Sequence, residues 1–140
     1  MSLPFVEVSA EEGAKVELQQ FESGSRHLSS LRAQVKRNAQ VSYLQLGGGG
    51  DLSRTSLRVY LKAEGACAEL YGLSLLEGAS SSHIHATVIH AAAHTRSSQL
   101  FKGVLAGGVV LALQVKSLYI RKRKKPKPTN CTKLFCSVLT

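Results

Sequence analysis

The stretch Gly65-Ala66-Cys67-Ala68-Glu69-Leu70 decides the fold, because its order of a small-residue turn followed by a strand occurs three times. The earlier copies begin at Gly13-Ala14 and at Asn38-Ala39, so the spacings along the chain are 25 and 27 residues. Gly and Asn tolerate the positive φ of a sharp corner, and Ala is small enough to lie where successive coils stack closely. A repeat of this length predicts a solenoid.

Short pieces with period-two alternation run through most of residues 5–105, which indicates an all-β chain. Further strands are expected at residues 55–61 and 83–90. Residues 26–37 suit either a short helix or a strand edge, and we leave them unassigned. The run Gly47-Gly48-Gly49-Gly50 is interpreted as a corner and not as a phosphate-binding loop, because no Gly-Lys-Ser/Thr follows it and the next residues lead into a strand.

The positive charge is concentrated at the C-terminal end of the 140-residue chain. The formal net charge is +9, but residues 108–140 hold eight of the 18 Lys and Arg residues and no acidic one, so residues 1–107 carry only +1. A folded nucleic-acid-binding domain usually carries its basic groups across its body. This distribution argues against nucleic-acid binding by the chain as a whole.

The cysteines and the N-terminus favour a cytoplasmic protein. Cys67, Cys131 and Cys136 form no paired framework, and the first residues lack the order of a signal peptide. The longest nearly apolar run, residues 104–115, is about half the ~20 residues that a membrane-spanning helix needs. We therefore expect no membrane span, and we keep peripheral membrane contact through the following basic run as a minor alternative.

The histidines of residues 83–94 are the candidates for metal chemistry. His83 and His85 are two residues apart and would face the same side of a strand, where imidazole ligands suit zinc, iron, nickel or copper. His90 would face the other side and needs a bulge or bend to join them. The commoner role for such histidines is structural, on a half-buried β surface, and both interpretations stay open.

Other reactive side chains have weaker support. Ser97 and Ser98 lie near His94, but no nucleophile-elbow motif or orienting carboxylate accompanies them, which argues against acyl transfer. Cys67 is expected to fill a small apolar position in a strand, because the sequence places no electropositive group next to its thiol.

The same histidine region resembles the SufB/SufD family of iron–sulfur cluster assembly proteins. That family carries a His-x-Thr-hydrophobic-x-His segment followed by Ser-x-x-Leu-x-Lys-Gly. Here these segments read His85-Ala86-Thr87-Val88-Ile89-His90 and Ser97-Ser98-Gln99-Leu100-Phe101-Lys102-Gly103. The Gly-rich run before Arg54, the Gly65-Ala66 turn and the earlier turns also look like the family. The resemblance covers residues 5–107 and is closer to SufD than to SufB, although Ile89 and Ala93 depart from the usual Asp and Pro.

The resemblance implies a partial right-handed parallel β-helix and a scaffold function without enzymatic activity. A SufD-like subunit would pair with a SufB-like subunit and with a SufC-like ABC ATPase that performs the ATP turnover. The complex would assemble an iron–sulfur cluster transiently, and we expect no cluster on this chain alone. The family's residues for cluster assembly and partner docking lie beyond the point where this chain diverges, which leaves His85 and His90 as the metal candidates.

Residues 108–140 depart from the family, so we divide the chain into a core at residues 5–107 and an aberrant, basic, disordered tail at residues 108–140. Back-translation in another frame restores the family's missing motifs, and we interpret the tail as an out-of-frame translation of a SufD-like gene. Two rival functions remain open. One is a small β metal-binding protein that uses His83, His85 and His90, and the other is an adaptor that binds nucleic acid through its basic tail.

Overall fold

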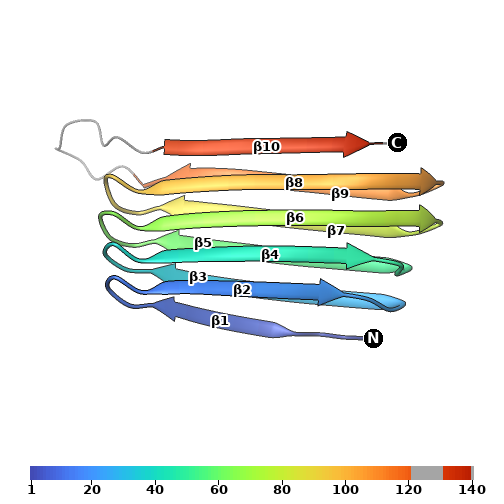
Figure 1. The fold of residues 1–140 in the computed structure, drawn as a ribbon, viewed down its shortest axis with the longest axis horizontal. Coiled ribbons are helices and arrows are strands. Elements are labelled where there is room, and N and C mark those ends of the chain that lie inside the picture. The colour runs from blue at the N-terminus through green and yellow to red at the C-terminus, as the bar shows by residue number, and fades with distance from the viewer. Residues whose placement is uncertain (121–130, 140) are drawn as a thin grey trace.

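The computed structural model describes residues 1–120 and 131–139, which form a parallel β-solenoid (Figure 1). The strands are β1 (Phe5–Ala10), β2 (Lys15–Glu22), β3 (Arg26–Val35), β4 (Gln40–Gly48), β5 (Leu52–Leu61), β6 (Cys67–Gly78), β7 (Ser81–His90), β8 (Arg96–Gly107), β9 (Val110–Tyr119) and β10 (Cys131–Leu139). The described residues contain no helix, so none of them could form a membrane-spanning one. The all-β solenoid expected from the sequence is confirmed.

Two parallel sheets face each other across the interior. Odd-numbered strands form one sheet in the order β1-β3-β5-β7-β9, and even-numbered strands form the other in the order β10-β8-β6-β4-β2. Consecutive strands therefore alternate between the sheets, and each coil adds one strand to each. This is the arrangement that a repeat of 25 to 27 residues predicts, since one repeat contains two strands and two corners.

The three predicted turns lie at one corner of successive coils, where their backbones are hydrogen-bonded to one another. Gly13, Asn38 and Gly65 all have positive φ, as expected. The amide of Asn38 donates to the carbonyl of Glu64, and the amide of Gly65 donates to the carbonyl of His94. At Gly65 a Cβ would also collide with the Asn38 side chain, so both the positive φ and the close approach of the neighbouring coil favour glycine at this position.

His94 occupies the next turn position in the series. Its φ is +54°, and it is followed by Thr95 where the earlier coils have Ala39 and Ala66. Thr95 is fully buried, like those alanines. Sequence reasoning missed this fourth turn because neither His nor Thr is the small residue that marks the other three.

The interior changes in character along the strands. In the earlier coils the inward positions near the corner just described are apolar, as at Val35, Leu61 and Ala68, which are fully buried. In the coil of β7 and β8 the same corner also holds the buried His90. Toward the other corner, residues 22–25 and 47–51, the inward positions become polar and include Glu22, Gln45 and Thr55. An apolar column supplies the main driving force for stacking the coils, whereas buried polar groups need partners.

The segment that was left unassigned is a strand, since residues 26–35 form β3 and pair in parallel with β1 and β5. The glycine run ends β4 and forms a corner at Gly49, whose φ is positive, so its interpretation as a corner is confirmed.

The solenoid continues past the boundary expected at Gly107. The expected boundary lies at the corner between β8 and β9, and β9 pairs with β7 over ten registered residues. Disorder is the wrong expectation for residues 110–119 and 131–139, because their backbone is paired in strands. For residues 110–119 the reason is that Leu111, Leu113 and Val115 alternate inward and extend the buried columns of the coil below. The basic run of residues 121–127 lies outside the described residues.

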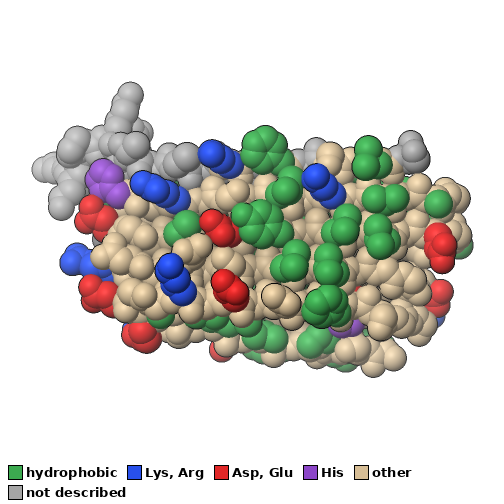
Figure 2. All heavy atoms as spheres, viewed as in Figure 1, with side chains coloured by type: hydrophobic (Ala, Val, Ile, Leu, Met, Phe, Trp, Pro, Cys, Tyr) green, Lys and Arg blue, Asp and Glu red, His purple; other side chains and the backbone are tan. Residues whose placement is uncertain are grey.

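The outer faces of the two sheets differ. Figure 2 shows hydrophobic side chains gathered over the middle and one end of the even-numbered sheet. Its outward positions include Leu46, Leu73, Leu75, Leu100 and Val104, all at least partly exposed. The odd-numbered sheet instead presents a row of arginine and lysine side chains outward.

Candidate functional site

The histidines of β7 lie on two different faces of one strand. His83 and His85 point outward and are half-buried, whereas His90 points inward and is 1% exposed. The ladder of β7 with β5 and β9 is continuous, so no bulge turns His90 toward the outer face. The structure thus brings His83 and His85 to one face, as predicted, and does not bring His85 and His90 together.

Metal-ligating residues do not converge elsewhere in the described part of the chain. Residues 1–120 and 131–139 contain no group of three or more His, Cys, Asp and Glu side chains placed to hold a metal ion. A metal on the outer face of β7 would therefore have only the two imidazoles of His83 and His85 as neighbouring ligands from the described residues.

His90 is the centre of a buried polar cluster that joins β7 to β8. Its Nδ1 lies 2.7 Å from the Thr95 hydroxyl, and its Nε2 lies 3.1 Å from the Ser97 hydroxyl. The Thr95 hydroxyl donates to the carbonyl of Ala92, so its oxygen accepts from Nδ1–H. The imidazole Nε2 is then the acceptor for the Ser97 hydroxyl, an assignment that follows from the partners and not from observed hydrogens.

An aromatic ring covers His90 from the next coil. Tyr119 of β9 is in register with His90, and their rings are stacked at a centroid separation of 4.6 Å. Desolvation in this environment lowers the pKa of the His90 imidazole below its ordinary value. His90 is consequently a neutral hydrogen-bonding residue inside the solenoid.

The His90–Ser97 pair does not have the arrangement of a nucleophile and its base. The group on Nδ1 is a hydroxyl and not a carboxylate, and Ser97 is itself 4% exposed, which closes it to a substrate. Ser98, the other serine considered, lies on the opposite face of β8. Sequence reasoning placed His94 beside these serines, whereas His94 forms the corner and His90 makes the contact.

A second polar cluster surrounds the buried carboxylate of Glu22. Its Oε1 accepts from Thr55 at 3.0 Å and from Gln20 at 2.9 Å, and its Oε2 accepts from Ser53 at 2.6 Å. The imidazole of His27 lies 3.3 Å from Oε1. Side chains from β2, β3 and β5 therefore converge on one carboxylate, and this cluster ties the two sheets together at the polar corner.

The Glu22 cluster was not predicted from the sequence. Its donors are the amide of Gln20 and the hydroxyls of Ser53 and Thr55, which no short motif links to Glu22, and only the stacking of the coils brings residues of β5 to a carboxylate of β2. Gly47 is the one local signal, because it faces inward beside Glu22 and a Cβ there would lie 3.4 Å from the carboxylate.

Cys67 begins β6 at the corner where the turns stack, and its side chain is half-buried. Burial and the nearby Glu69 carboxylate raise the pKa of its thiol, with a smaller opposing effect from Arg96. The thiolate is the reactive form, so these surroundings make Cys67 a weak nucleophile. Cys67 alternates with the buried Ala68 and therefore faces outward, beside Arg37 and Arg96, and not into an apolar interior position.

Comparison with known proteins identifies the family. The model described as the SufBD core domain of SUF-system FeS cluster assembly matches residues 1–116, which is most of the chain and extends past Gly107. Neither a curated protein nor a solved structure matches significantly. The His90–Ser97 contact joins residues 85–90 to residues 97–103, which are the two segments whose sequences resemble the SufB/SufD family. The chain therefore belongs to the SufBD core-domain family of the SUF system for iron–sulfur cluster assembly.

Proposed function

We propose that this chain acts as a SufD-like scaffold subunit in iron–sulfur cluster assembly. The observation that carries the proposal is the link between β7 and β8 through His90 and Ser97, within a match to the SufBD core domain. The Ser97–Gly103 segment resembles SufD more closely than SufB. Its inward residues Gln99 and Phe101 fill the interior, which gives this segment a role in building the coil.

The proposed role is structural and not catalytic. The iron–sulfur cluster is the cargo of the complex, which this chain forms with a SufB-like partner, while a SufC-like ABC ATPase hydrolyses ATP. Two features support this division of labour: the glycine run of residues 47–50 lacks the lysine of a phosphate-binding loop, and the described histidines form no converging ligand set. The exposed apolar face of the even-numbered sheet is consistent with work in a complex (Figure 2).

We further propose that the C-terminal part of the chain is out of frame with a longer SufD-like gene. We place the shift at about residue 108, because an alternative frame restores an Arg-x-x-Phe-x-Gly motif across residues 109–117. The family match, which extends to residue 116, overlaps the start of this segment. Further support is that the same frame restores an Ala-Gln-Lys-Thr motif and a following Tyr-Gln across residues 122–131. The acid-free basic run of residues 121–127 is unlike the rest of the chain, which is nearly balanced in charge.

Resequencing the gene across the codons for residues 103–131, followed by copurification, tests both proposals. A single-base insertion or deletion that restores the long frame is expected, and the tagged restored protein is expected to copurify with a SufB-like and a SufC-like subunit. The present 140-residue chain, tagged in the same way, is the matched control. An intact frame as written would overturn the frameshift, and copurification with a SufD-like subunit instead would overturn the SufD-like assignment.

The metal-binding alternative makes a different prediction. Because His83 and His85 share an outer face, a metal site there would leave stoichiometric zinc, iron, nickel or copper on the purified chain. Elemental analysis of the wild-type chain and of His83→Ala distinguishes the alternatives. Metal that disappears with His83 would favour the metal-binding protein over the scaffold.

A further inference from the structure

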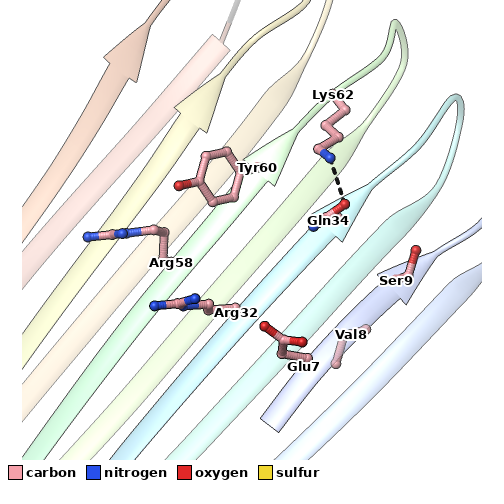
Figure 3. A pocket seen from close by; sticks show the side chains of 8 residues that line it. All are labelled: Glu7, Val8, Ser9, Arg32, Gln34, Arg58, Tyr60 and Lys62. Carbon is pink, nitrogen blue, oxygen red and sulfur yellow. Dashed lines mark hydrogen bonds between the residues drawn. The ribbon is translucent and has the colours of Figure 1, made fainter. Parts of the chain in front are cut away.

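A groove of about 460 Å³ lies on the outer face of the odd-numbered sheet, across β1, β3 and β5 (Figure 3). Arg32, Arg58 and Lys62 line it together with the single carboxylate of Glu7. Three cations and one carboxylate leave the groove with a net charge of +2. Residues 1–107 as a whole carry only +1, so the charge is concentrated locally.

The two arginines of the groove lie directly beside each other. Arg32 of β3 and Arg58 of β5 are registered partners, and neighbouring strands lie about 4.8 Å apart. Figure 3 shows both side chains extending in the same direction. Like charges in register on one sheet face destabilise the fold, so packing alone does not account for this pair.

Glu7 of β1 is registered beside Arg32 on the side away from Arg58, so it compensates at most one of the two positive charges. The registered neighbour of Arg58 on its other side is the uncharged Thr87. Among the described Lys and Arg residues, the one close ion pair joins Lys36 to Glu11 at 2.6 Å, outside the groove. The guanidinium of Arg32 lies 5.6 Å from the ring centroid of Phe5, a contact that orients it without neutralising it. Lys62 donates to Gln34 at 2.6 Å and is held at the other end of the groove.

We propose that this groove binds the phosphoryl group of a small phosphate ester between Arg32 and Arg58. A phosphate monoester carries about −1.5 to −2 charges at neutral pH, which matches the net charge of the groove. Guanidinium groups donate paired hydrogen bonds to phosphate oxygens, and two neighbouring guanidiniums present two such pairs to one tetrahedral group. The groove is larger than a phosphate ion and falls in the size range of small-molecule sites, so the rest of the ester lies toward Tyr60.

The test is surface plasmon resonance on the immobilised full chain, with adenosine monophosphate, inorganic phosphate and adenosine as probes. In about 0.15 M salt, which screens diffuse attraction, adenosine monophosphate is expected to bind saturably and about tenfold more tightly than adenosine. Tighter binding of adenosine monophosphate than of phosphate identifies an ester site. Equal binding identifies a site for the phosphoryl group alone, and both results support the groove.

Matched variants distinguish binding in the groove from general electrostatic attraction to the positively charged face. Arg58→Gln and Arg32→Gln are each expected to weaken adenosine monophosphate binding about tenfold, the loss of one charge-assisted contact. Arg54→Gln, an exposed charge on the same face of β5 outside the groove, is expected to change it by less than about twofold. Circular dichroism verifies that each variant is folded. If Arg58→Gln does not fold, the binding of adenosine monophosphate to Arg32→Gln tests the same groove.

Three results would overturn the proposal. One is the absence of saturable binding by either phosphate probe, and another is equal binding of adenosine and adenosine monophosphate. The third is an Arg54→Gln effect as large as that of Arg58→Gln, because the binding would then come from the overall field of the face and not from the paired arginines.

Discussion

The imidazole Nε2 of His90 lies 3.1 Å from the hydroxyl oxygen of Ser97, and this contact joins β7 to β8 inside the solenoid. The two residues come from the two segments that resemble the SufB/SufD family. The motif therefore corresponds to a physical connection between the two sheets, made where the chain turns at His94.

Replacing His90 tests how much this connection contributes to the free energy of unfolding. His90→Ala removes a fully buried ring and leaves the Ser97 and Thr95 hydroxyls without it, so we expect a loss of about 3 kcal/mol in the free energy of unfolding. His83→Ala, on the outer face of the same strand, is the control and should cost less than about 0.5 kcal/mol. Urea unfolding measures both, and equal losses would contradict a special role for His90.

Stability is expected to depend on pH through His90. Burial lowers the pKa of the folded imidazole below its ordinary value of 6.5, so the unfolded chain binds the proton first as the pH falls. The stabilisation is complete above pH 6.5 and decreases below it, by at most about 1.4 kcal/mol per pH unit. Urea unfolding of wild type and His90→Gln at several pH values isolates this contribution. Parallel profiles for the two proteins would show that other groups cause the dependence.

The buried Glu22 carboxylate is expected to stabilise the polar corner. Glu22→Gln keeps the shape but replaces an acceptor oxygen with an amide donor facing hydroxyl groups, so we expect a loss of about 2 kcal/mol. Glu17→Gln, at an exposed position of β2, should change stability by less than about 0.5 kcal/mol. Thermal unfolding of the two variants provides the comparison. If Glu22→Gln is as stable as Glu17→Gln, the network around the carboxylate contributes little.

The interior has no room for a side chain at Gly72. A Cβ there would collide with the Phe101 ring on the neighbouring strand β8, so Gly72→Ala is expected to cost about 1–3 kcal/mol. The loss should be smaller in a Phe101→Leu background, because the collision is with that ring. Gly108→Ala is the control, since its Cβ would meet its nearest neighbour at an ordinary 3.7 Å. If Gly72→Ala costs as much stability in the Phe101→Leu background as in the wild type, the collision with the Phe101 ring is not the cause of the loss.

The chain is expected to self-associate through its last coil. β9 is the outermost described strand of its sheet, and Leu111, Leu113 and Val115 are only partly buried there. An open parallel edge with apolar neighbours invites further strand pairing. Sedimentation velocity at increasing concentration should show oligomers.

Lysine substitutions test which surface of the chain mediates self-association. Val110→Lys combined with Leu118→Lys should reduce association, because charged side chains on an edge strand oppose pairing. Leu75→Lys, in the middle of the even-numbered sheet, should have little effect. A wild-type chain that stays monomeric at high concentration would contradict the prediction, and a strong Leu75→Lys effect would assign association to the apolar face.

The sequence by itself determined the repeating plan of this protein. Gly13, Asn38 and Gly65 mark corners because few residues adopt a positive φ, and alternation such as Leu57-Arg58-Val59 separates inside from outside along each strand. Local sterics and period-two patterning are properties of short segments, so they can be read without the fold. They also placed His83 and His85 on one face and His90 on the other.

Only the tertiary structure decided which residues meet between coils. The stacking of Tyr119 on His90, the convergence of Ser53 and Thr55 on Glu22, and the pairing of Arg32 with Arg58 all depend on the alignment of residues 26 to 33 positions apart in the chain. A one-residue change in register would reverse every side chain of a strand. The candidate sites therefore come from the alignment of coils, which no single segment of the sequence specifies.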